Sequence, residues 1–460
     1  MIANKTVFII ITRGFLVRNM LRSGVLRLLN AAGIRTVIFF PLLGKTTEVP
    51  SSLRKELEGP LVKIIGVREA RLGRIHKVFC HLAKFLVFTK STWTYCLVSV
   101  KNDQQRSDAL AWIERLIFSR LSQWRVLKRL ARAIEEHVFR QRHYAEYFEA
   151  ERPSVVFSTS IISTLDLLFM KEARRRGIPT ISIPKGWDNI AKIFYRFLPD
   201  RLLVQNEPMV DAAATLQDIP RSRIQVVGFP QFDWYVHRDL LMSRESYGAK
   251  MGLDPQRRII LFGSEGKWAP SDFTIAEHIA KFIQTPRALA APCSLLIRPH
   301  FSEAHDPRLT QRSFGPHVVL DTNFTDSNFF LDRWDPRDEE TLMFMNTLFH
   351  MDVLVTTTST LVLDAACFDK PIVNVAYEIL YKNGRDVSGL FYEKEHYQWV
   401  LRTGAVDLVT SDAELLSALN ESLAHPEKKA TQRQRLRDEV CYLVDGQSSQ
   451  RVVGALRSML

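Results

Sequence analysis

The feature that most constrains the fold is a strand, turn, helix and second strand in the first forty residues. Thr6–Thr12 is an apolar run rich in β-branched residues, with the length of a buried strand. Arg13-Gly14 interrupts it, and apolar residues at helical spacing follow over 19–32. A glycine ends that helix, and Thr36–Phe40 is the next strand. This pattern predicts a βαβ unit and hence a parallel sheet.

Strand and helix patterns alternate again from residue 154 and, after a polar stretch, from residue 259. Ile259–Phe262, Leu295–Arg298 and Val353–Val355 are the expected strands of this second series. We therefore predict an α/β chain of two doubly wound, Rossmann-like sheets that face each other across a cleft. Ligands bind at the carboxyl ends of such strands, so the cleft is the expected site.

The expected organisation has three parts. Residues 1–235 form a first α/β domain, with a basic helical insertion at about 68–150. Residues 250–440 form a second α/β domain, and residues 441–460 form a C-terminal helix that packs back on the first domain.

Charge is distributed unevenly along the chain. The net charge is +12 over 460 residues, yet residues 1–150 hold 26 Lys and Arg against 11 Asp and Glu, so their excess of +15 leaves −3 for the remainder. Such asymmetry indicates contact with a polyanion, which can be nucleic acid, an anionic membrane or a phosphate-bearing substrate. A basic face that is merely solvated is the simpler alternative.

The basic residues of 68–142 alternate with Trp and Phe in helical patterns. Cationic amphipathic helices of this kind lie in anionic membrane interfaces.

No uncharged apolar run of about 18 residues is present, and the N-terminus lacks the cleavage site of a signal peptide. The five cysteines are far apart and odd in number, which argues against a disulfide framework or a zinc site. We expect a cytoplasmic protein, peripheral at the inner membrane, that contacts the anionic membrane surface through 68–142.

A hydroxyl-rich loop between a strand and a helix is the strongest functional pattern. Amide groups at a helix N-terminus attract phosphate, and hydroxyl groups add donors. In the alternative, one of these hydroxyls only caps the helix. Asp364, one turn into the helix, holds a sugar hydroxyl in one interpretation and pairs with a buried arginine in the other. The loop residues are Thr357, Thr358, Ser359 and Thr360.

Two further loops follow strands of the second series. Arg298 and His300 end one strand, where they would neutralise a diphosphate, although a lone histidine is more often a structural hydrogen-bonding group. Gly263 and Ser264 follow another strand, and a glycine there lets the backbone approach a ligand.

The first series offers two candidate stretches. In the first, Trp187 would stack on a sugar ring, Asp188 would act as a general base toward an acceptor hydroxyl, and Asn189 would face the acceptor. A tight turn with a packed tryptophan is the alternative. The second is Arg13 with Gly14, after the first strand, as a similar acceptor-side candidate.

Signatures of several other enzyme classes are absent from the sequence. It contains no D-x-D triplet, no P-loop, no G-x-G-x-x-G, no G-x-S-x-G and no H-E-x-x-H. We therefore expect no metal site and no cofactor, with a nucleotide-sugar serving as co-substrate.

Several of these stretches together resemble the GT-B glycosyltransferases. They are Arg298-Pro299-His300, the Thr356–Asp364 loop with Lys370–Val373, and the turn at Gly14. The surface-polysaccharide members, of capsule or O-antigen type and related to CDP-glycerol glycerophosphotransferases, are similar at four further places. These are Gly186–Asn189, Pro199–Glu207, Val226–Asp233 and Asp445–Arg451.

The resemblance covers most of residues 150–460 and implies roles for the two domains. The second domain would bind the nucleotide donor, with His300 and the loop of Thr357, Ser359 and Thr360 on its phosphates, and the first would hold the acceptor. Phe301 stands where glycerophosphotransferase-like sequences usually have proline.

The leading hypothesis is a metal-independent glycosyltransferase that moves a sugar from a nucleotide-sugar to a lipid-linked or growing surface glycan. Asp188 and His300 are its expected catalytic residues. A nucleotide-sugar 2-epimerase and a CDP-glycerol-type glycerophosphotransferase are the alternatives. A non-catalytic glycan- or nucleic-acid-binding protein fits least, because no nucleic-acid recognition motif is present.

Overall fold

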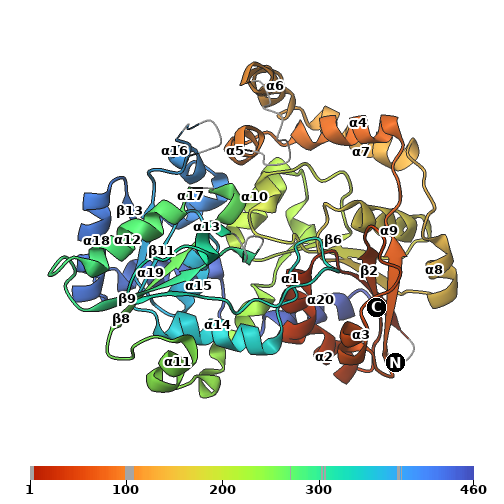
Figure 1. The fold of residues 1–460 in the computed structure, drawn as a ribbon. Helices are drawn as coiled ribbons and strands as arrows, with labels where there is room; N and C mark the ends of the chain where they lie inside the picture. The colour runs from red at the N-terminus through yellow and green to blue at the C-terminus, as the bar shows by residue number, and fades with distance from the viewer. Residues whose placement is uncertain are drawn as a thin grey trace.

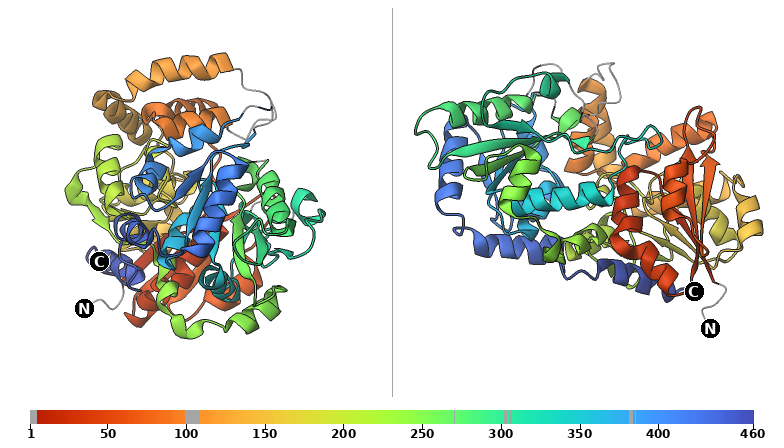
Figure 2. Two further views of the ribbon diagram at one scale, coloured as in Figure 1. Left: turned by 90° about the vertical axis from the view of Figure 1, so that its left-hand side faces the viewer. Right: turned by 60° about the horizontal axis from the view of Figure 1, so that its bottom comes forward.

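Two parallel α/β sheets organise the chain. A computed structural model describes residues 5–98, 108–269, 271–301, 304, 307–380, 384 and 386–460. The two sheets lie side by side, each with its own helices, and both chain ends lie at the first (Figures 1 and 2). The α/β two-sheet prediction is confirmed.

The first sheet has seven strands in the order β3-β2-β1-β4-β5-β6-β7, and every neighbouring pair is parallel. This order reverses direction beside β1, as a doubly wound sheet does. The strands are β1 Thr6–Ile10, β2 Arg35–Leu42, β3 Val62–Arg68, β4 Val155–Ser158, β5 Thr180–Ser182, β6 Arg201–Val204 and β7 Ile224–Val226.

The second sheet has six strands in the order β10-β9-β8-β11-β12-β13, again all parallel. Its central strands are buried apart from the exposed Arg258 at the start of β8, as expected for strands covered on both faces. The strands are β8 Arg258–Gly263, β9 Cys293–Arg298, β10 Val318–Leu320, β11 Val353–Thr356, β12 Ile372–Val375 and β13 Asp407–Val409.

Helices cover both faces of each sheet (Figure 1). Those of the first half are α1 Gly14–Leu16, the π-helical η1 Val17–Val25, α2 Leu26–Ala31, α3 Ser51–Leu57, α4 Arg74–Ala83, α5 Lys90–Val98, α6 Asp108–Leu121, α7 Arg125–His137, α8 Ala145–Glu151, α9 Thr164–Arg175 and α10 Glu207–Leu216. Those of the second half are α11 Arg244–Met251, α12 Phe273–Gln284, α13 Pro307–Thr310, α14 Asp338–His350, α15 Leu361–Cys367, α16 Ser388–Tyr392, α17 Glu395–Leu401, α18 Asp412–Ala424 and α19 Ala430–Leu436. Short 3₁₀ turns include η2 Lys84–Leu86, η3 Asn189–Ala191 and η5 Pro230–Val236; the π-helical η9 Arg437–Cys441 leads to α20 Ser448–Arg457.

Two sequence predictions of secondary structure need correction. The helix expected over 19–32 begins at Gly14 and passes through η1, where Gly24 has a φ of +122°, so it is kinked rather than regular. The polar stretch 233–255, whose composition is typical of a linker, instead contains part of η5 and all of α11, because Tyr247 and Met251 are buried in the core.

The basic insertion projects beyond both sheets as helices α4 to α7, at the top of Figure 1 and of the left view of Figure 2. Its outer surface is unusually apolar: Ile75 is 81% exposed and Leu116 67%. Among the described residues, no helix is both long and apolar enough to cross a membrane. The other exposed large apolar side chains of these helices are Val78, Leu82, Trp112, Ile113, Ile117, Trp124, Val126 and Leu130.

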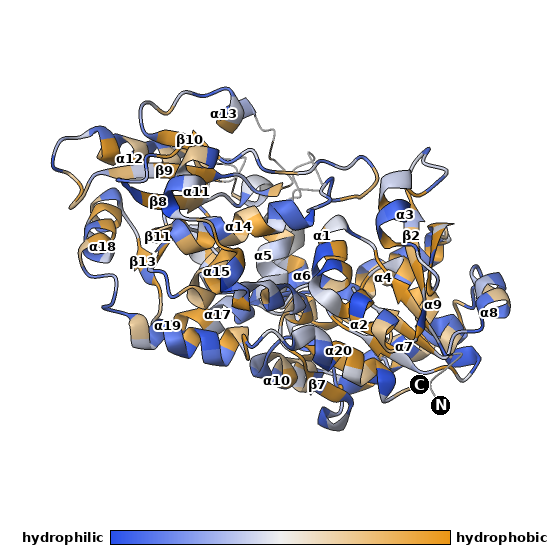
Figure 3. Ribbon diagram, turned by 90° about the horizontal axis from the view of Figure 1, so that it is seen from below, coloured by the Kyte–Doolittle hydropathy of each residue, from blue (hydrophilic) through white to orange (hydrophobic). Residues whose placement is uncertain are grey.

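Two segments from the C-terminal part of the chain pack on the first half. The first, which we call the strap, is residues 321–337; its Phe329 and Phe330 are 6% and 4% exposed and belong to the same apolar core as β1 (Figure 2, right). The second is α20, whose Val452 and Leu456 enter that core. Apolar residues dominate the strands of this sheet (Figure 3). Contacts of distant segments therefore hold the halves together.

Candidate functional site

The carboxyl ends of β5, β8 and β11 bring three loops together between the two halves. Trp187, in the loop after β5, donates from Nε1 to Thr360 Oγ1 at 3.3 Å across the interface. Its ring is 3% exposed and packs edge-on against His396, with centroids 4.9 Å apart. Trp187 thus joins the halves in this conformation, and no ring face is open for the sugar stacking that the sequence suggested.

The hydroxyl-rich loop lies at the end of β11, as predicted. Thr360 precedes α15 without making a side-chain cap, and Ser359 Oγ accepts from Leu361 N at 3.4 Å. The amides of Thr358, Ser359 and Thr360 bond to no other described residue. Thr357 differs, because its side chain is 2% exposed and its Oγ1 has no partner among the described residues. The loop therefore offers free donors from 358 to 360.

Asp188 and Asn189 contact each other and the next turn. Asn189 Nδ2 donates to Asp188 Oδ1 at 2.5 Å, and Asp188 Oδ2 forms an ion pair with Lys192. Burial alone would raise the pKa of Asp188, but the charge and the hydrogen bond of Lys192 hold it well below its usual value. A carboxylate with a lowered pKa is a weak base, so this arrangement does not favour Asp188 as the general base.

Ionisable side chains that the sequence did not single out surround this aspartate. Burial lowers the pKa of Lys394 to about 7, and the charge of Lys192 adds to the effect. Burial also lowers the pKa of Lys185 to about 8, with a further contribution from Arg13. Shifted pKa values where the two halves meet make this cluster the candidate functional site.

Two more groups of the second half border the same space. His396 is 4% exposed, and burial holds its pKa well below the ordinary value, so its ring is neutral. Burial raises the pKa of Glu265, against the opposing charge of Lys394 and a hydrogen bond with Ser359. The site is thus a cluster of ionisable side chains, shielded from water, to which both halves contribute.

Arg298 and His300 end β9 as predicted, but their situations differ. Arg298 is 8% exposed, pairs through Nη1 with Asp321, and is stacked between Phe324 and Phe344 at 4.7 and 4.4 Å. Its charge is therefore paired within the protein, and the diphosphate role expected for it stays a prediction. His300 is half-buried, with its ring 4.1 Å from that of Phe301.

Gly263 and Ser264 support the loop after β8 and do not project from it. A Cβ on Gly263 would lie 2.2 Å from Leu361 Cδ1, so glycine permits α15 to approach β8. Ser264 is 4% exposed, and its Oγ bonds Asp272 Oδ1 at 3.3 Å and accepts from Gly266 N at 3.0 Å. Both residues shape the turn, and a donor-binding role for the Ser264 hydroxyl would require these bonds to break.

Asp364 is buried beneath the hydroxyl-rich loop, where it accepts from Tyr235 OH at 2.5 Å. Burial raises its pKa to about 6, although this hydrogen bond and the charge of Arg18 oppose the shift. Of the two interpretations from the sequence, proximity to a buried arginine agrees better with this geometry than contact with a ligand hydroxyl.

Arg13 and Gly14 lie where β1 ends, under the strap. The amides of Gly14 and Phe15 donate to the two carboxylate oxygens of Asp332 at 2.9 and 3.1 Å. A Cβ on Gly14 would lie 1.5 Å from the Trp334 carbonyl oxygen, so only glycine fits. Arg13 Nη1 donates to its neighbour Thr12 O at 2.9 Å. The strap therefore covers the acceptor-side turn that the sequence proposed.

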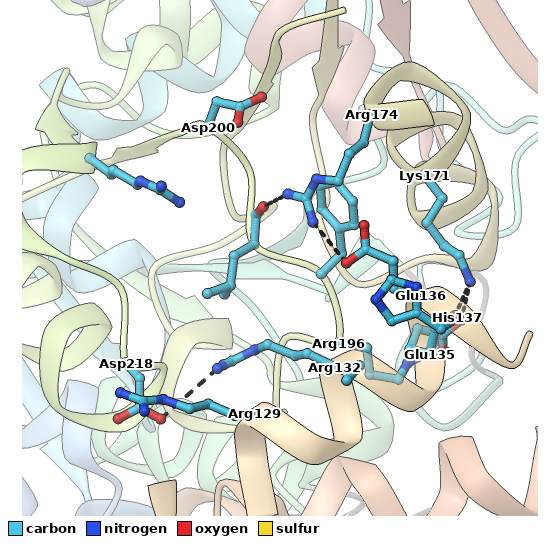
Figure 4. Close-up of a pocket in the computed structure, with 14 residues that line it drawn as sticks. Arg129, Arg132, Glu135, Glu136, His137, Lys171, Arg174, Arg196, Asp200 and Asp218 are labelled. Atoms are coloured by element: carbon cyan, nitrogen blue, oxygen red, sulfur yellow. Dashed lines mark hydrogen bonds and ion pairs between the residues drawn. The ribbon is translucent and has the colours of Figure 1, made fainter. Parts of the chain in front are cut away.

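A second hollow, of about 490 Å³, lies between α7, α9 and the loops before β6 and β7 (Figure 4). Most of its cations already have protein partners: Lys171 and Arg196 bond Glu135 at 2.8 and 2.7 Å, and Arg174 bonds Glu136 at 3.3 Å. The hollow lies away from the carboxyl ends of the strands, so it is not the candidate site. The ion pairs that line it attach the insertion to the sheet.

Ligand-type side chains do gather beside this hollow. His76, Cys80 and Glu135 bring donor atoms within 4.8 Å of one another. The set does not suit a cation, because Arg196 donates to Cys80 Sγ at 2.8 Å and two cations already neutralise Glu135.

Sequence reasoning missed Lys394 and His396 because they lie in an ordinary charged run, Glu393–His396, with no motif around them. Lys185 and Glu265 are adjacent in the chain to the candidate stretches Gly186–Asn189 and Gly263-Ser264, but nothing in the sequence shows that burial would change their pKa. Only the folded arrangement reveals these four residues as one cluster.

Comparison with known proteins agrees with this architecture. The model of the CDP-glycerol:poly(glycerophosphate) glycerophosphotransferase family matches residues 198–458, so the chain belongs to this family and is a transferase. No curated protein matches the sequence. The family match supports the predicted class, enzymes of surface-polymer synthesis. It does not assign the chain to capsule or O-antigen synthesis.

Solved structures with the same fold are similar along nearly the whole chain. The wall teichoic acid polymerase TagF, with CDPG, has 13% identity and a TM-score of 0.52, covering 99% of this chain and 88% of that one. The UDP-GlcNAc 2-epimerase of Methanocaldococcus jannaschii has 12% identity and a TM-score of 0.55, with 99% of each chain covered. That of Neisseria meningitidis has 11% identity and a TM-score of 0.53, with 98% and 100% covered. The fold is of the GT-B type.

Proposed function

We propose that this chain transfers a polyol phosphate of glycerol phosphate type from a CDP-linked donor to a hydroxyl group of a growing surface polymer. The observation that carries this proposal is the family match over residues 198–458, which contains the candidate site's second half. The cluster of Lys185, Lys192 and Lys394 supports it, since the substrates of such a reaction are rich in phosphate.

In the proposed reaction the acceptor oxygen attacks the outer phosphorus of the donor diphosphate. A new P–O bond forms, the anhydride bond breaks, and CMP leaves with the electron pair. Positive groups and free amides aimed at the phosphates stabilise the charge that develops there. We place the donor on the second half and its phosphates beside the 358–360 amides, and the acceptor on residues 1–235. Residues 250–440 form the donor domain, and 441–460 belong structurally with the first.

His300 is the proposed general base for the acceptor hydroxyl. It is half-buried at the carboxyl end of β9, and Asp188 is a weaker candidate because its pKa is lowered.

Sugar transfer from a nucleotide-sugar is the second candidate. It is supported by the resemblance of Arg298–His300 and the 356–364 loop to GT-B glycosyltransferases. The two reactions leave different nucleotides: phosphate transfer releases CMP, whereas sugar transfer breaks the bond to the sugar carbon and releases the nucleoside diphosphate. A 2-epimerase would turn over without any acceptor.

The acceptor is proposed to be anchored at an anionic membrane, against which helices α4, α6 and α7 would rest. The supporting observation is the combination of exposed apolar and basic side chains, such as Leu116 beside Arg120 and Leu130 beside Arg129. Flotation with phosphatidylglycerol vesicles tests this; equal failure to float with anionic and neutral vesicles would refute it.

The decisive experiment incubates the protein with CDP-glycerol or UDP-GlcNAc, with and without a glycerol phosphate oligomer as acceptor, and identifies the released nucleotide. Acceptor-dependent CMP from CDP-glycerol is the expected result. UDP from UDP-GlcNAc would instead establish sugar transfer, and epimerised UDP-sugar without acceptor would establish the isomerase. A thermal-shift screen shows first which nucleotide binds.

A further inference from the structure

Three lysines lie where the two halves meet, and two of them form no ion pair with an acid of the described residues. Within the part of the chain that the structure describes, Lys394 donates only to Thr358 Oγ1, at 3.3 Å, and its ammonium lies 4.0 Å from the Phe391 ring centroid. Lys185 makes no hydrogen bond to any described residue. Lys192 pairs with Asp188. The side chains of Lys185 and Lys394 are half-buried, and proteins rarely withdraw an ammonium group from water without a counter-charge, so this place lacks an anion.

The three ammonium groups come from different halves. Lys185 and Lys192 belong to the segment after β5 in the first half, and Lys394 directly precedes α17 in the second. The Trp187–Thr360 hydrogen bond of 3.3 Å holds the first segment against the 358–360 loop. An anion among the lysines would therefore touch both halves and the free amides together.

We propose that Lys185, Lys192 and Lys394 form a phosphate-binding seam that grips the diphosphate of the nucleotide donor from both halves at once. This inference rests on the proposed function and names the residues that recognise the charged part of its donor. Neither the sequence motifs nor the family match assigns these lysines.

The charged groups around Lys394 determine how the seam responds to a ligand. Lys192 and Asp188 face it from the first half, and Glu265 and His396 face it from the second. Lys185 shares Lys192 and Asp188 as neighbours and also lies near Arg13 and Asp332. The three carboxylates only partly offset the cations. Burial thus lowers the pKa of Lys394 to about 7, and that amine is largely neutral at pH 8.

A bound diphosphate would return the missing negative charge and favour the ammonium form. Donor binding at pH 8 should therefore take up a proton. CDP-glycerol and UDP-GlcNAc suit this measurement, because a diphosphate esterified at both ends has no ionisation of its own near this pH.

Isothermal titration calorimetry of both donors at pH 8, in two buffers of different ionisation enthalpy, measures this proton. We expect an uptake of more than about half a proton, from the Lys394 pKa of about 7. Lys394→Arg keeps a permanent charge, so it should bind the donor within a few-fold of the wild type and take up much less. Lys394→Met should weaken binding at least about tenfold, the loss of one charge-assisted contact.

Lys281→Met, at an exposed position of α12, is the matched control and should change neither quantity. Thermal unfolding shows whether each variant is folded. Binding without proton uptake in the wild type, or undiminished uptake in Lys394→Arg, would overturn the inference and leave the proposed function standing. Failure of both donors to bind would overturn the proposed function first, and the seam with it.

Discussion

The two cation-rich regions of this protein differ in how their charges are held. The insertion carries many lysines and arginines, and they are either exposed, as Arg120 and Arg129 are, or matched by acids, as Lys128 is by Asp218. The interface of the two halves has only a few, yet Lys185 and Lys394 are half-buried there and form no ion pair with a carboxylate of the described residues. The number of charged residues therefore does not identify the candidate site. Withdrawal of unpaired charges from water does.

The largest expected effect lies in the insertion, at its buried centre. Glu135→Ala would leave Lys171 and Arg196 unpaired, and removing one partner of a buried ion pair costs about 3–5 kcal/mol. Chemical denaturation of the full chain measures this loss as a lower free energy of unfolding. Glu149→Ala is the control, since Glu149 is 68% exposed and pairs with Arg176 at the surface, where about 1 kcal/mol or less is at stake. Equal losses of stability in the two variants would show that the ion pairs of Glu135 are no more buried than the surface pair of Glu149.

The second effect concerns pH and a buried carboxyl below the cleft. The folded-state pKa of Asp364, about 6, exceeds its ordinary value of 3.8, so the folded protein holds this proton more tightly than the unfolded chain. Stability contributed by this group is present below pH 4 and is lost as the pH rises to about 6. The loss is about 3 kcal/mol at most.

Asp364→Asn removes this titration and keeps an oxygen that can accept from Tyr235. We expect the wild type to lose stability relative to the variant between pH 4 and pH 7, as followed by thermal unfolding. A difference that stays constant over this range would contradict the raised pKa.

The third effect separates function from stability in the cleft. Lys185→Met should lower kcat/KM about 10- to 100-fold, as loss of a charge-assisted contact to substrate does. Because the variant no longer buries an unpartnered ammonium, it should unfold at the same temperature or higher. Activity assays paired with thermal unfolding give both values. A variant that loses stability along with activity would place Lys185 among ordinary structural charges.

The smallest effect is expected at the exposed cations of the insertion. Arg120→Ser with Arg129→Ser should weaken binding to phosphatidylglycerol vesicles by about 1 kcal/mol for each charge removed. Turnover of a short soluble acceptor should stay unchanged. Flotation and the nucleotide-release assay provide the two measurements. Slower turnover on the soluble acceptor would mean that these charges serve the site and would remove the contrast between the regions.

The sequence predicts the architecture well because alternating apolar runs and turn residues are local signals. Thr6–Ile10, the glycine after the first helix and the run at Val353–Thr356 each identify their element without help from the rest of the chain. The hydroxyl-rich loop is predictable for the same reason, since a strand, five hydroxyl residues and a helix are adjacent in the chain.

The roles of single residues depend on contacts that no local pattern contains. Arg298 ends a strand as expected, but it forms an ion pair with Asp321, which lies 23 residues later in the chain. Trp187 meets Thr360, 173 residues away. Asp332 occupies the amides of Gly14 and Phe15 from the other half of the chain. Burial, which shifts the pKa of Lys394, is likewise a property of the whole fold.

The strap has a consequence for anyone who recombines this protein with a relative. Phe329 and Phe330 lie in the second half of the chain but are buried in the apolar core of the first half. Burial of each phenylalanine contributes about 1.5–3 kcal/mol. A chimaera joined near residue 250 would therefore present its new partner with two foreign rings and a foreign Asp332. The second half can be exchanged as a module only if the first-half residues that receive the strap are exchanged with it.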